Sequence, residues 1–383
     1  MPDLLDLDDR TLLVELQSLG VRVEQEDRAA MPSRQGGAGP SDALFLWVRG
    51  LPLTVPRHAA FVERSPYVLR VREGRTLLYR DDELVGPAKL PRRPRIYDLE
   101  TADGIPYWKI ALLHLDSIAS TVVQKCIYWG TAEQCAFCGI ELTRGEQTIP
   151  VKTPAQLAEV CTAARDLDGA VDVTLTTGSI NRRDRGALYL SRCAAAIKEA
   201  CGLPIQVQFE PPDDPDVLEQ VARSGVDAVG VHIETFDPDV LQAVAAGKAQ
   251  CGIEGYFRCW ERAVEVFGRG HVTTYVILGM GERPELIEEG CRRAIELGVF
   301  PFVVPLRPVP GTPLGDSPAP HPDYVAGIYR SVAAMLADAG LDHVQAKAGC
   351  ARCQACSGLS AWERLFRRED GDGLHELPVV HSA

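Results

Sequence analysis

The sequence predicts an α/β protein in which short buried strands alternate with amphipathic helices, between a small N-terminal α/β domain and a cysteine-rich C-terminal extension. Three observations predict this fold. Short runs rich in Val, Ile, Leu, Phe and Thr recur between residues 118 and 306, helix-start signals separate them, and six of the twelve cysteines fall into two tight triplets. Alternating strands and helices predict a parallel sheet. A doubly wound sheet and an open or partial barrel fit this pattern equally well.

The bulk composition limits the classes of function. A chain of 383 residues with 46% apolar residues is long enough for one barrel-sized domain with appendages, or for two to three domains. The formal charge of −13 repels phosphate backbones, so we expect no nucleic-acid partner. The acidic N-terminus is not a signal peptide, and no stretch approaches the ~18 uninterrupted apolar residues of a membrane helix. We therefore expect a cytoplasmic protein without a membrane partner, whose cysteines are reduced thiols and metal ligands.

Residues 1–100 are expected to form the small α/β domain. Leucines at helical spacing predict its helix, and a turn at residues 73–75 between two apolar runs predicts a β-hairpin. A glycine-rich stretch precedes a strand rather than a helix, which favours a plain turn, or a lid that lets Arg34 reach a ligand, over a phosphate cradle. The segments are, in order, the helix Asp9–Leu19, the glycine-rich stretch Ser33–Asp42, the strand Ala43–Val48, the hairpin strands Tyr67–Arg72 and Thr76–Arg80, and a linker Gly86–Pro94.

Residues 101–340 carry the repeated strand–helix pattern. Thr153-Pro154 followed by Gln156 predicts a capping box with a proline in the first turn, and Asp214-Pro215 and Asp237-Pro238 repeat the cap-plus-proline signal. A last helix is expected near Tyr324–Ala339, followed by the extension 341–383 with a polar, partly mobile tail from Arg367. The predicted strands are Ile118–Lys125, Val171–Thr176, Ile205–Phe209, Ala228–Ile233, Val272–Leu278 and Phe300–Leu306.

Candidate site residues follow the ends of these strands. In a parallel barrel or open sheet, ligands bind at the carboxyl ends of the strands. Residues at these ends are therefore expected to form one site: Cys126, Gly178, Glu210, Glu234 and Gly279–Glu282.

Two cysteine triplets carry the strongest chemical signal. Cys126, Cys135 and Cys138 begin at the end of the first predicted strand, and three thiolates fit either an iron–sulfur cluster with one open iron or a zinc site with a distant fourth ligand. The second triplet, Cys350, Cys353 and Cys356, predicts a second cluster. A zinc site is the alternative there, with His343 as the nearest nitrogen ligand.

Together these motifs resemble the radical S-adenosylmethionine (SAM) superfamily. Cys135-Ala-Phe-Cys138 matches the end of its cysteine signature, although eight residues rather than three separate Cys126 from Cys135. Val231-His-Ile-Glu-Thr235 and Trp260-Glu-Arg262 resemble motifs of the biotin and lipoyl synthase branch, and Pro308–Pro313 resembles a loop after the sixth strand. The resemblance covers residues 118–315 and implies a partial (β/α)6 TIM-like barrel.

The resemblance also implies cofactors and roles. Three thiolates would hold a [4Fe–4S] cluster, and SAM would bind its open iron. Glu234 would contact the SAM ribose, and Arg262 would contact the SAM carboxylate. The backbone of Gly279 and Gly281, in the turn that ends at Glu282, would contact the adenine. Hydroxyls in Thr177-Gly178-Ser179 would meet its amino group, in place of the family's Gly-Gly-Glu turn. No protein side chain is assigned as catalytic, since the cofactor supplies the chemistry.

A narrower likeness is to the radical SAM protein of bacterial nitrilase-type gene clusters, carried by Gly36-Gly-Ala-Gly-Pro-Ser-Asp42 and the C-terminal triplet. The implied reaction is reductive cleavage of SAM to a 5′-deoxyadenosyl radical that acts on a small molecule, with a reductant such as flavodoxin or ferredoxin. The second cluster, also expected to be [4Fe–4S], would bind substrate, relay an electron or donate sulfur. The competing hypothesis is a non-catalytic zinc or iron–sulfur sensor.

Overall fold

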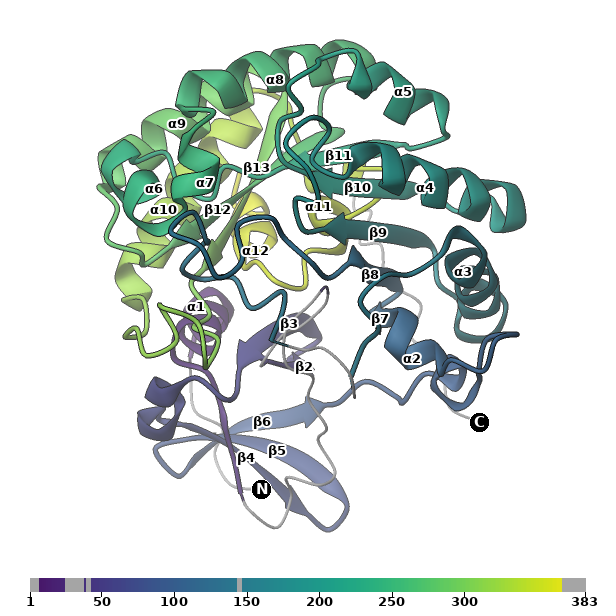
Figure 1. Cartoon of the computed structure of the whole chain (residues 1–383). Coiled ribbons are helices and arrows are strands. Elements are labelled where there is room, and N and C mark those ends of the chain that lie inside the picture. The colour runs from purple at the N-terminus through teal and green to yellow at the C-terminus, as the bar shows by residue number, and fades with distance from the viewer. Residues whose placement is uncertain (1–6, 25–37, 39–42, 143–146, 367–383) are drawn as a thin grey trace.

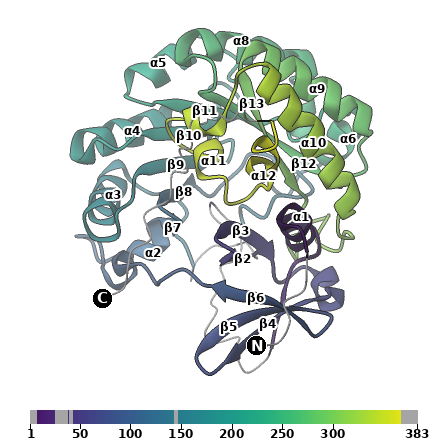
Figure 2. The same cartoon turned by 180° about the vertical axis from the view of Figure 1, so that it is seen from behind.

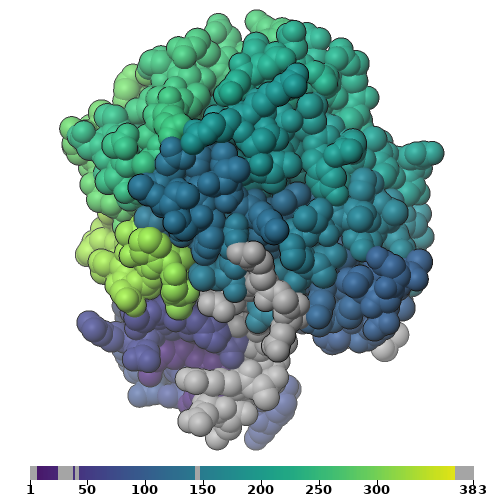
Figure 3. All heavy atoms as spheres, in the orientation of Figure 1, coloured from purple at the N-terminus to yellow at the C-terminus, as the bar shows by residue number. Residues whose placement is uncertain are grey.

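The computed structural model describes residues 7–24, 38, 43–142 and 147–366, which build two β-sheets (Figure 1). A six-stranded N-terminal sheet lies below a larger, curved seven-stranded sheet with helices around its outside. The space-filling view shows the N-terminal residues as a smaller lobe under the larger one (Figure 3). The glycine-rich stretch Ser33–Asp42, except Ala38, and the charged tail from Arg367 lie outside the described residues.

The N-terminal domain is a β-sheet domain rather than the expected α/β unit. Its strand order is β1-β4-β5-β6-β2-β3. The one long helix described in it, α1 (Asp9–Leu19), packs against β3 through buried leucines such as Leu12 and Leu16. This domain has its own apolar core, separate from that of the larger sheet. The strands are β1 (Arg22–Val23), β2 (Ala43–Val48), β3 (Leu51–Pro56), β4 (Tyr67–Arg72), β5 (Arg75–Arg80) and β6 (Glu83–Lys89), and η2 (Ala60–Arg64) is a 3₁₀ turn.

The predicted hairpin is confirmed, whereas the first part of the predicted linker is wrong. Strands β4 and β5 pair around the turn at residues 73–74. Residues 86–89 belong to β6, which pairs with β5 and then with β2. Pro87 is tolerated because pairing with β2 begins only at Ala88, so the missing proline N–H removes no bond on that side.

The larger sheet has the order β13-β12-β11-β10-β9-β8-β7. Strands β8 to β13 are parallel and neighbours in the sheet are neighbours in the sequence, while β7 pairs antiparallel with β8. A doubly wound sheet would reverse its strand order, so the sequential order selects the partial barrel. The strands are β7 (Leu112–His114), β8 (Ser117–Val123), β9 (Asp172–Thr177), β10 (Ile205–Phe209), β11 (Ala228–Val231), β12 (Val272–Leu278) and β13 (Val299–Pro305).

Helices follow each parallel strand and cover the convex face, as the view from behind also shows (Figure 2). Their apolar faces join one continuous core with the strands. The helices are α2 (Tyr107–Ile110), α3 (Pro154–Asp168), α4 (Ala187–Cys201), α5 (Val217–Arg223), α6 (Pro238–Val244), α7 (Ala246–Ala249), α8 (Ile253–Phe267), α9 (Pro284–Leu297) and α10 (Pro322–Asp338), with a 3₁₀ turn η3 (Arg95–Asp98). Within the described residues, none of the helices has the length and apolar character needed to cross a bilayer.

The predicted helix starts are confirmed at α3 and α6. The Thr153 N–H donates to Gln156 Oε1 at 2.9 Å and the Gln156 N–H donates to Thr153 Oγ1 at 3.2 Å, which is a capping box. Asp237 accepts from two backbone N–H groups in the first turn of α6. Asp214 instead accepts from the Asp216 N–H at 3.0 Å and closes a turn just before α5 begins.

The C-terminal segment contacts the start of β9 and strand β13. It comprises η4 (His343–Gln345), α11 (Cys350–Cys353) and α12 (Leu359–Glu363). Gly349 N–H donates to Asp172 at the start of β9, and Ser357 Oγ donates to the Val303 carbonyl in β13. The Ala355 carbonyl accepts from Thr54 N–H in β3 at 2.8 Å. The segment therefore ties the sheet to the N-terminal domain.

Candidate functional site

The first cysteine triplet lies on a loop that leaves the sheet after β8. This loop is fastened by backbone hydrogen bonds to the segments that follow β9, β11 and β13. The donors and acceptors are Ile127 N–H to Ser179 O (2.8 Å), Ala136 N–H to Val244 O (2.7 Å) and Leu314 N–H to Ala136 O (2.9 Å). Residues remote in sequence thus hold the loop over the carboxyl ends of the strands.

Gly178 sits where the end of β9 meets the start of this loop. A Cβ at Gly178 would lie 2.2 Å from the Lys125 carbonyl oxygen and 3.1 Å from Cys126 Cβ, so only glycine fits. Ser179 is buried, and its carbonyl holds the loop as described above. The Thr177 hydroxyl donates to the Gly178 carbonyl at 2.9 Å. The structure therefore brings all three predicted residues beside the first triplet.

The three thiols share one buried environment. Burial raises the pKa of Cys126, raises that of Cys135 well above its ordinary value, and raises that of Cys138 to about 11. Cys126 adds to the rise at Cys138, and the ammonium of Lys248 opposes the rise at all three thiols. A metal or cluster must therefore displace protons to bind here.

Glu234 lies at the end of β11 in an ion pair that the sequence does not reveal. Its carboxylate is buried and accepts from Lys248 Nζ at 2.5 Å, and the ammonium also donates to the His232 carbonyl at 2.9 Å. Burial opposes the charge, but Glu234 raises the pKa of Lys248 well above its ordinary value. Backbone hydrogen bonds with Tyr275 and Ile277 fix Glu234 against β12, in a left-handed conformation with φ of 74°.

Lys248 was not predicted from the sequence. The signal that could have identified it is a lone lysine in the run of small residues Ala245–Ala249, where a charged side chain has no acidic neighbour in the sequence. The structure places it by docking α7 on the cysteine loop. The Gly247 N–H donates to the Glu133 carbonyl at 3.2 Å, and a Cβ at Gly247 would lie 2.9 Å from the Tyr128 ring.

The glycine turn after β12 is built by Glu282. Its carboxylate accepts from the backbone N–H groups of Gly279 (2.7 Å) and Met280 (2.8 Å) and from the Tyr324 hydroxyl (2.7 Å). Gly279 and Gly281 both have φ of 100°, which favours glycine. Glu282 therefore shapes the turn, and the glycines leave its backbone open to close approach.

Arg262 lies apart from this group. Its guanidinium pairs with Glu219 of α5 and with Glu265 one turn further along α8. The buried face of α8 carries Trp260 and Ala263 instead. The helix phase thus turns Arg262 toward a neighbouring helix, and the structure does not bring it to the other predicted residues.

The second cysteine triplet lies inside the barrel, on α11 and the turn that follows. Cys350 Sγ accepts from the Tyr275 hydroxyl and from Gln208 Nε2, both at 3.3 Å. Cys353 Sγ lies 4.0 Å from His114 Nδ1, and Cys356 Sγ lies 3.9 Å from Thr54 Oγ1. The triplet therefore meets both the barrel strands and the N-terminal sheet.

Basic groups surround Cys356. Burial alone would raise its pKa, but Arg307 and His114 lower it to about 6. Burial would lower the pKa of His114, but Cys353 and Cys356 raise it to about 10. Arg307 and His114 thus favour the thiolate form of Cys356, the form in which cysteine binds metals.

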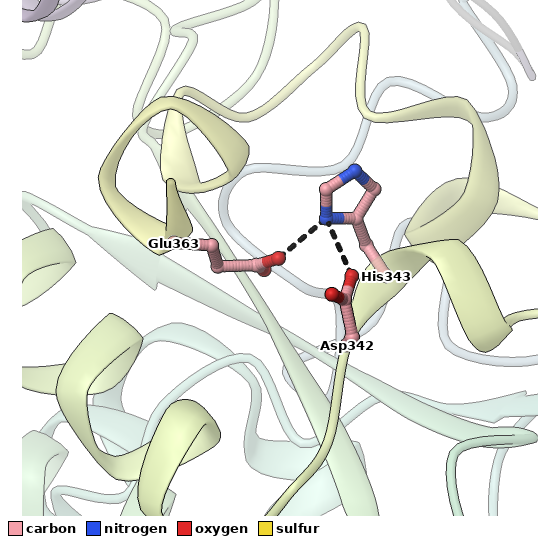
Figure 4. A group of neighbouring side chains, drawn as sticks. All are labelled: Asp342, His343 and Glu363. Carbon is pink, nitrogen blue, oxygen red and sulfur yellow. Dashed lines mark hydrogen bonds and ion pairs between the residues drawn. The ribbon is translucent and has the colours of Figure 1, made fainter. Parts of the chain in front are cut away.

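The His343 side chain contacts two carboxylates, and its place as a zinc ligand of the second triplet stays a prediction. Figure 4 shows His343 beside Asp342 and Glu363. Its Nδ1 contacts Glu363 and lies 3.3 Å from an Asp342 carboxylate oxygen. These three residues form a separate group at the C-terminal end, and His114 is the histidine that reaches the cysteines.

A cavity of about 350 Å³ is lined by all three cysteines of the second triplet. It also reaches Phe137, which lies between Cys135 and Cys138 in the sequence, and Glu234. Ala38, from the glycine-rich stretch, donates its N–H to Thr121 Oγ1 at 2.7 Å and also lines it. The remaining lining includes Thr174, Thr176, Gln208, His232, Tyr275, Phe302 and Arg307.

Comparison with known proteins gives a family match. Residues 130–299 match the Radical SAM superfamily. The bacteriochlorophyllide c C-7(1)-hydroxylase of Chlorobaculum limnaeum is 27% identical over an alignment of 229 residues, and the match covers 55% of this chain. The chain spans only 57% of that relative's length.

Solved structures resemble the chain more distantly. The match to methylornithine synthase covers 63% of this chain and 68% of that chain, with 17% identity and a TM-score of 0.48. The match to a radical SAM methyltransferase from Sphaerobacter thermophilus covers 70% of this chain and 75% of that chain, with 14% identity and a TM-score of 0.45.

Proposed function

We propose that the chain is a radical SAM enzyme whose 5′-deoxyadenosyl radical acts on a small molecule held in the cavity that the second cysteine triplet lines. The cavity carries this proposal. Phe137 and Glu234 line one part of it, and the second triplet lines another. Its volume falls in the range of about 300–1,000 Å³ that is usual for small-molecule sites.

We assign the first cluster to Cys126, Cys135 and Cys138. When bound there, a [4Fe–4S] cluster supplies the electron that cleaves SAM. The residues present fit this group: one loop carries three partly buried thiols, and Gly178 lacks the Cβ that would push against that loop. The loop's three backbone fastenings keep the thiols oriented without relying on their metal.

We assign SAM to the strand ends around this loop. Lys248 holds one oxygen of Glu234, which leaves the other oxygen to accept from ribose hydroxyls. The turn built by Glu282 offers the backbone of Gly279 and Gly281, and Thr177, Gly178 and Ser179 line the approach to Cys126. Arg262 is left out because its guanidinium is engaged elsewhere.

We also propose a second iron–sulfur cluster at Cys350, Cys353 and Cys356, and a reductant such as flavodoxin or ferredoxin as partner. The support for the cluster is a thiolate-favouring environment inside the cavity. The narrower likenesses, to biotin and lipoyl synthases and to the nitrilase-cluster protein, stay predictions.

Anaerobic SAM cleavage tests the proposal. We expect the reconstituted wild-type protein with a strong reductant to form 5′-deoxyadenosine, and Cys135→Ala to form none. Cys356→Ala is the matched control, since it alters only the second triplet, and it is expected to keep cleaving SAM. Absence of cleavage by wild-type protein with a fully loaded first cluster would overturn the assignment.

A further inference from the structure

We propose that His114 is the fourth protein ligand of the second metal site, together with Cys350, Cys353 and Cys356. The inference rests on the proposed second cluster and names its ligand set. His114 is separated from Cys353 by 239 positions in the chain, so no sequence spacing points to it.

The position of the imidazole fits a ligand. His114 ends the edge strand β7 and is 8% exposed. Its Nδ1 lies 4.0 Å from Cys353 Sγ. In a cubane each protein ligand binds a different iron, so His114 would bind the iron that the three thiolates leave open. The contact with Cys353 places His114 Nδ1 beside the triplet, as a ligand of that iron requires.

The second ring nitrogen is already held as a ligand histidine requires. His114 Nε2 lies 3.3 Å from Thr54 Oγ1, and Thr54 is buried in β3. Ligating histidines usually direct their other N–H at an oxygen acceptor, which fixes the ring. With Nε2–H directed at Thr54, metal binding would displace the proton from Nδ1 and use that lone pair. Thr54 is itself fixed by its N–H bond to the Ala355 carbonyl, in the middle of the cysteine motif.

The other nitrogen groups near the cavity fit worse. His232 Nδ1 already accepts from the Tyr275 N–H at 3.1 Å. His343 is held by Glu363 and Asp342. Arg307 lies beside Cys356, but a guanidinium is a cation without a free lone pair, so it is suited to balancing thiolate charge.

Four protein ligands would change the role of the site. A cluster held by three cysteines leaves a position for substrate, whereas one held by three cysteines and a histidine does not. Histidine in place of cysteine also raises the reduction potential of a cluster. The assignment therefore argues against substrate binding through an open iron at the second triplet.

Nitrogen hyperfine spectroscopy tests the ligand. The reconstituted, reduced wild-type protein is measured without SAM, because the SAM amino group would add its own nitrogen to the first cluster. We expect a strong ¹⁴N coupling that is lost in His114→Ala and in His114→Cys. His114→Cys is the matched variant, since a fourth thiolate should keep the iron content of wild type while removing the nitrogen signal.

Two results would overturn the assignment: no strong ¹⁴N coupling in wild-type protein, or a coupling that persists in His114→Ala. Iron analysis separates this failure from that of the underlying proposal. If Cys353→Ala loses no iron, the second cluster itself is absent and the ligand assignment falls with it. If Cys353→Ala loses iron but wild type shows no ¹⁴N coupling, only the role of His114 is wrong.

Discussion

The buried pair of Glu234 and Lys248 is the residue-scale feature on which the proposed SAM site depends. Both side chains are about nine-tenths buried, and Glu234 holds a left-handed φ that costs a non-glycine residue about 1–3 kcal/mol. Strain of this kind persists only where the surroundings enforce it, here through β12 on one side and Lys248 on the other. The pair thus sets the direction of a carboxylate beside the first triplet.

Removing Lys248 should destabilise the fold strongly. Lys248→Met leaves Glu234 buried without its cation, and the free energy of unfolding should fall by about 3 kcal/mol or more in a urea titration. The double variant Lys248→Met/Glu234→Gln should recover part of this loss, because no charge is then left unpaired. Lys198→Met, which breaks the more exposed pair with Asp227, is the control and should cost less than about 1 kcal/mol. Equal losses in the two single variants would contradict this account.

At this scale the sequence identifies residues by position but not by partner. Glu234 and Gly178 were found because they follow strands, and strand ends converge whatever the partners are. Lys248 was missed because only the docking of α7 on the cysteine loop brings it to Glu234. Arg262 was expected in the site because Trp260-Glu-Arg262 resembles a motif of the biotin and lipoyl synthase branch. However, Trp260 packs inward and sets the phase of α8, which turns Arg262 away from the site.

At the scale of elements, Asp237 joins two helices on the rim of the site. It caps α6 by accepting from the Asp239 and Val240 N–H groups, and it accepts from Arg283 at the start of α9. The Arg283 guanidinium holds the pKa of Asp237 well below its ordinary value. Its stabilising effect is therefore present above the unfolded-state pKa, about 3.9, and is lost as the pH falls toward the lower folded-state pKa.

Asp237→Ala should reveal this pH dependence. At pH 7 it should cost about 1–2 kcal/mol, from a lost cap and a half-exposed ion pair. The difference in melting temperature between wild type and variant should shrink between pH 5 and pH 3, because the wild-type carboxylate then loses its advantage. Asp239→Ala, at an exposed carboxylate, serves as control. A difference that stays constant to pH 3 would contradict the assigned cause.

Element boundaries were predictable where a local rule decides them. Thr153 and Asp237 mark helix starts because a side chain must accept the first free N–H groups. Residues 86–89 were taken as a linker because glycine and proline punctuate the chain, yet long-range pairing with β5 makes them a strand. Local sequence patterns do not show which strands, remote in sequence, pair in a sheet.

For the whole molecule, the arrangement of the two ends around the barrel decides what the cavity contains. Periodicity could not separate a barrel from a doubly wound sheet; only the strand order does. In the C-terminal segment, Arg352 pairs with Asp116 and with the fully buried Asp172, at the starts of β8 and β9. The N-terminal sheet contributes Thr54, whose hydroxyl contacts Cys356 Sγ. The sequence predicted two triplets but not that the cavity lined by the second triplet reaches Phe137 in the loop of the first.

The central claim is that one chain carries two iron–sulfur sites, one at each triplet. Iron, sulfide and zinc per chain, measured after anaerobic reconstitution, test it most directly. Two variants replace all three cysteines by alanine, one at Cys126, Cys135 and Cys138 and the other at Cys350, Cys353 and Cys356. Wild type should hold iron and sulfide for two clusters, about eight irons if both are cubanes. Each variant should lose the iron of its own triplet and keep that of the other. Zinc in place of iron, or an iron content unchanged in either variant, would contradict the account.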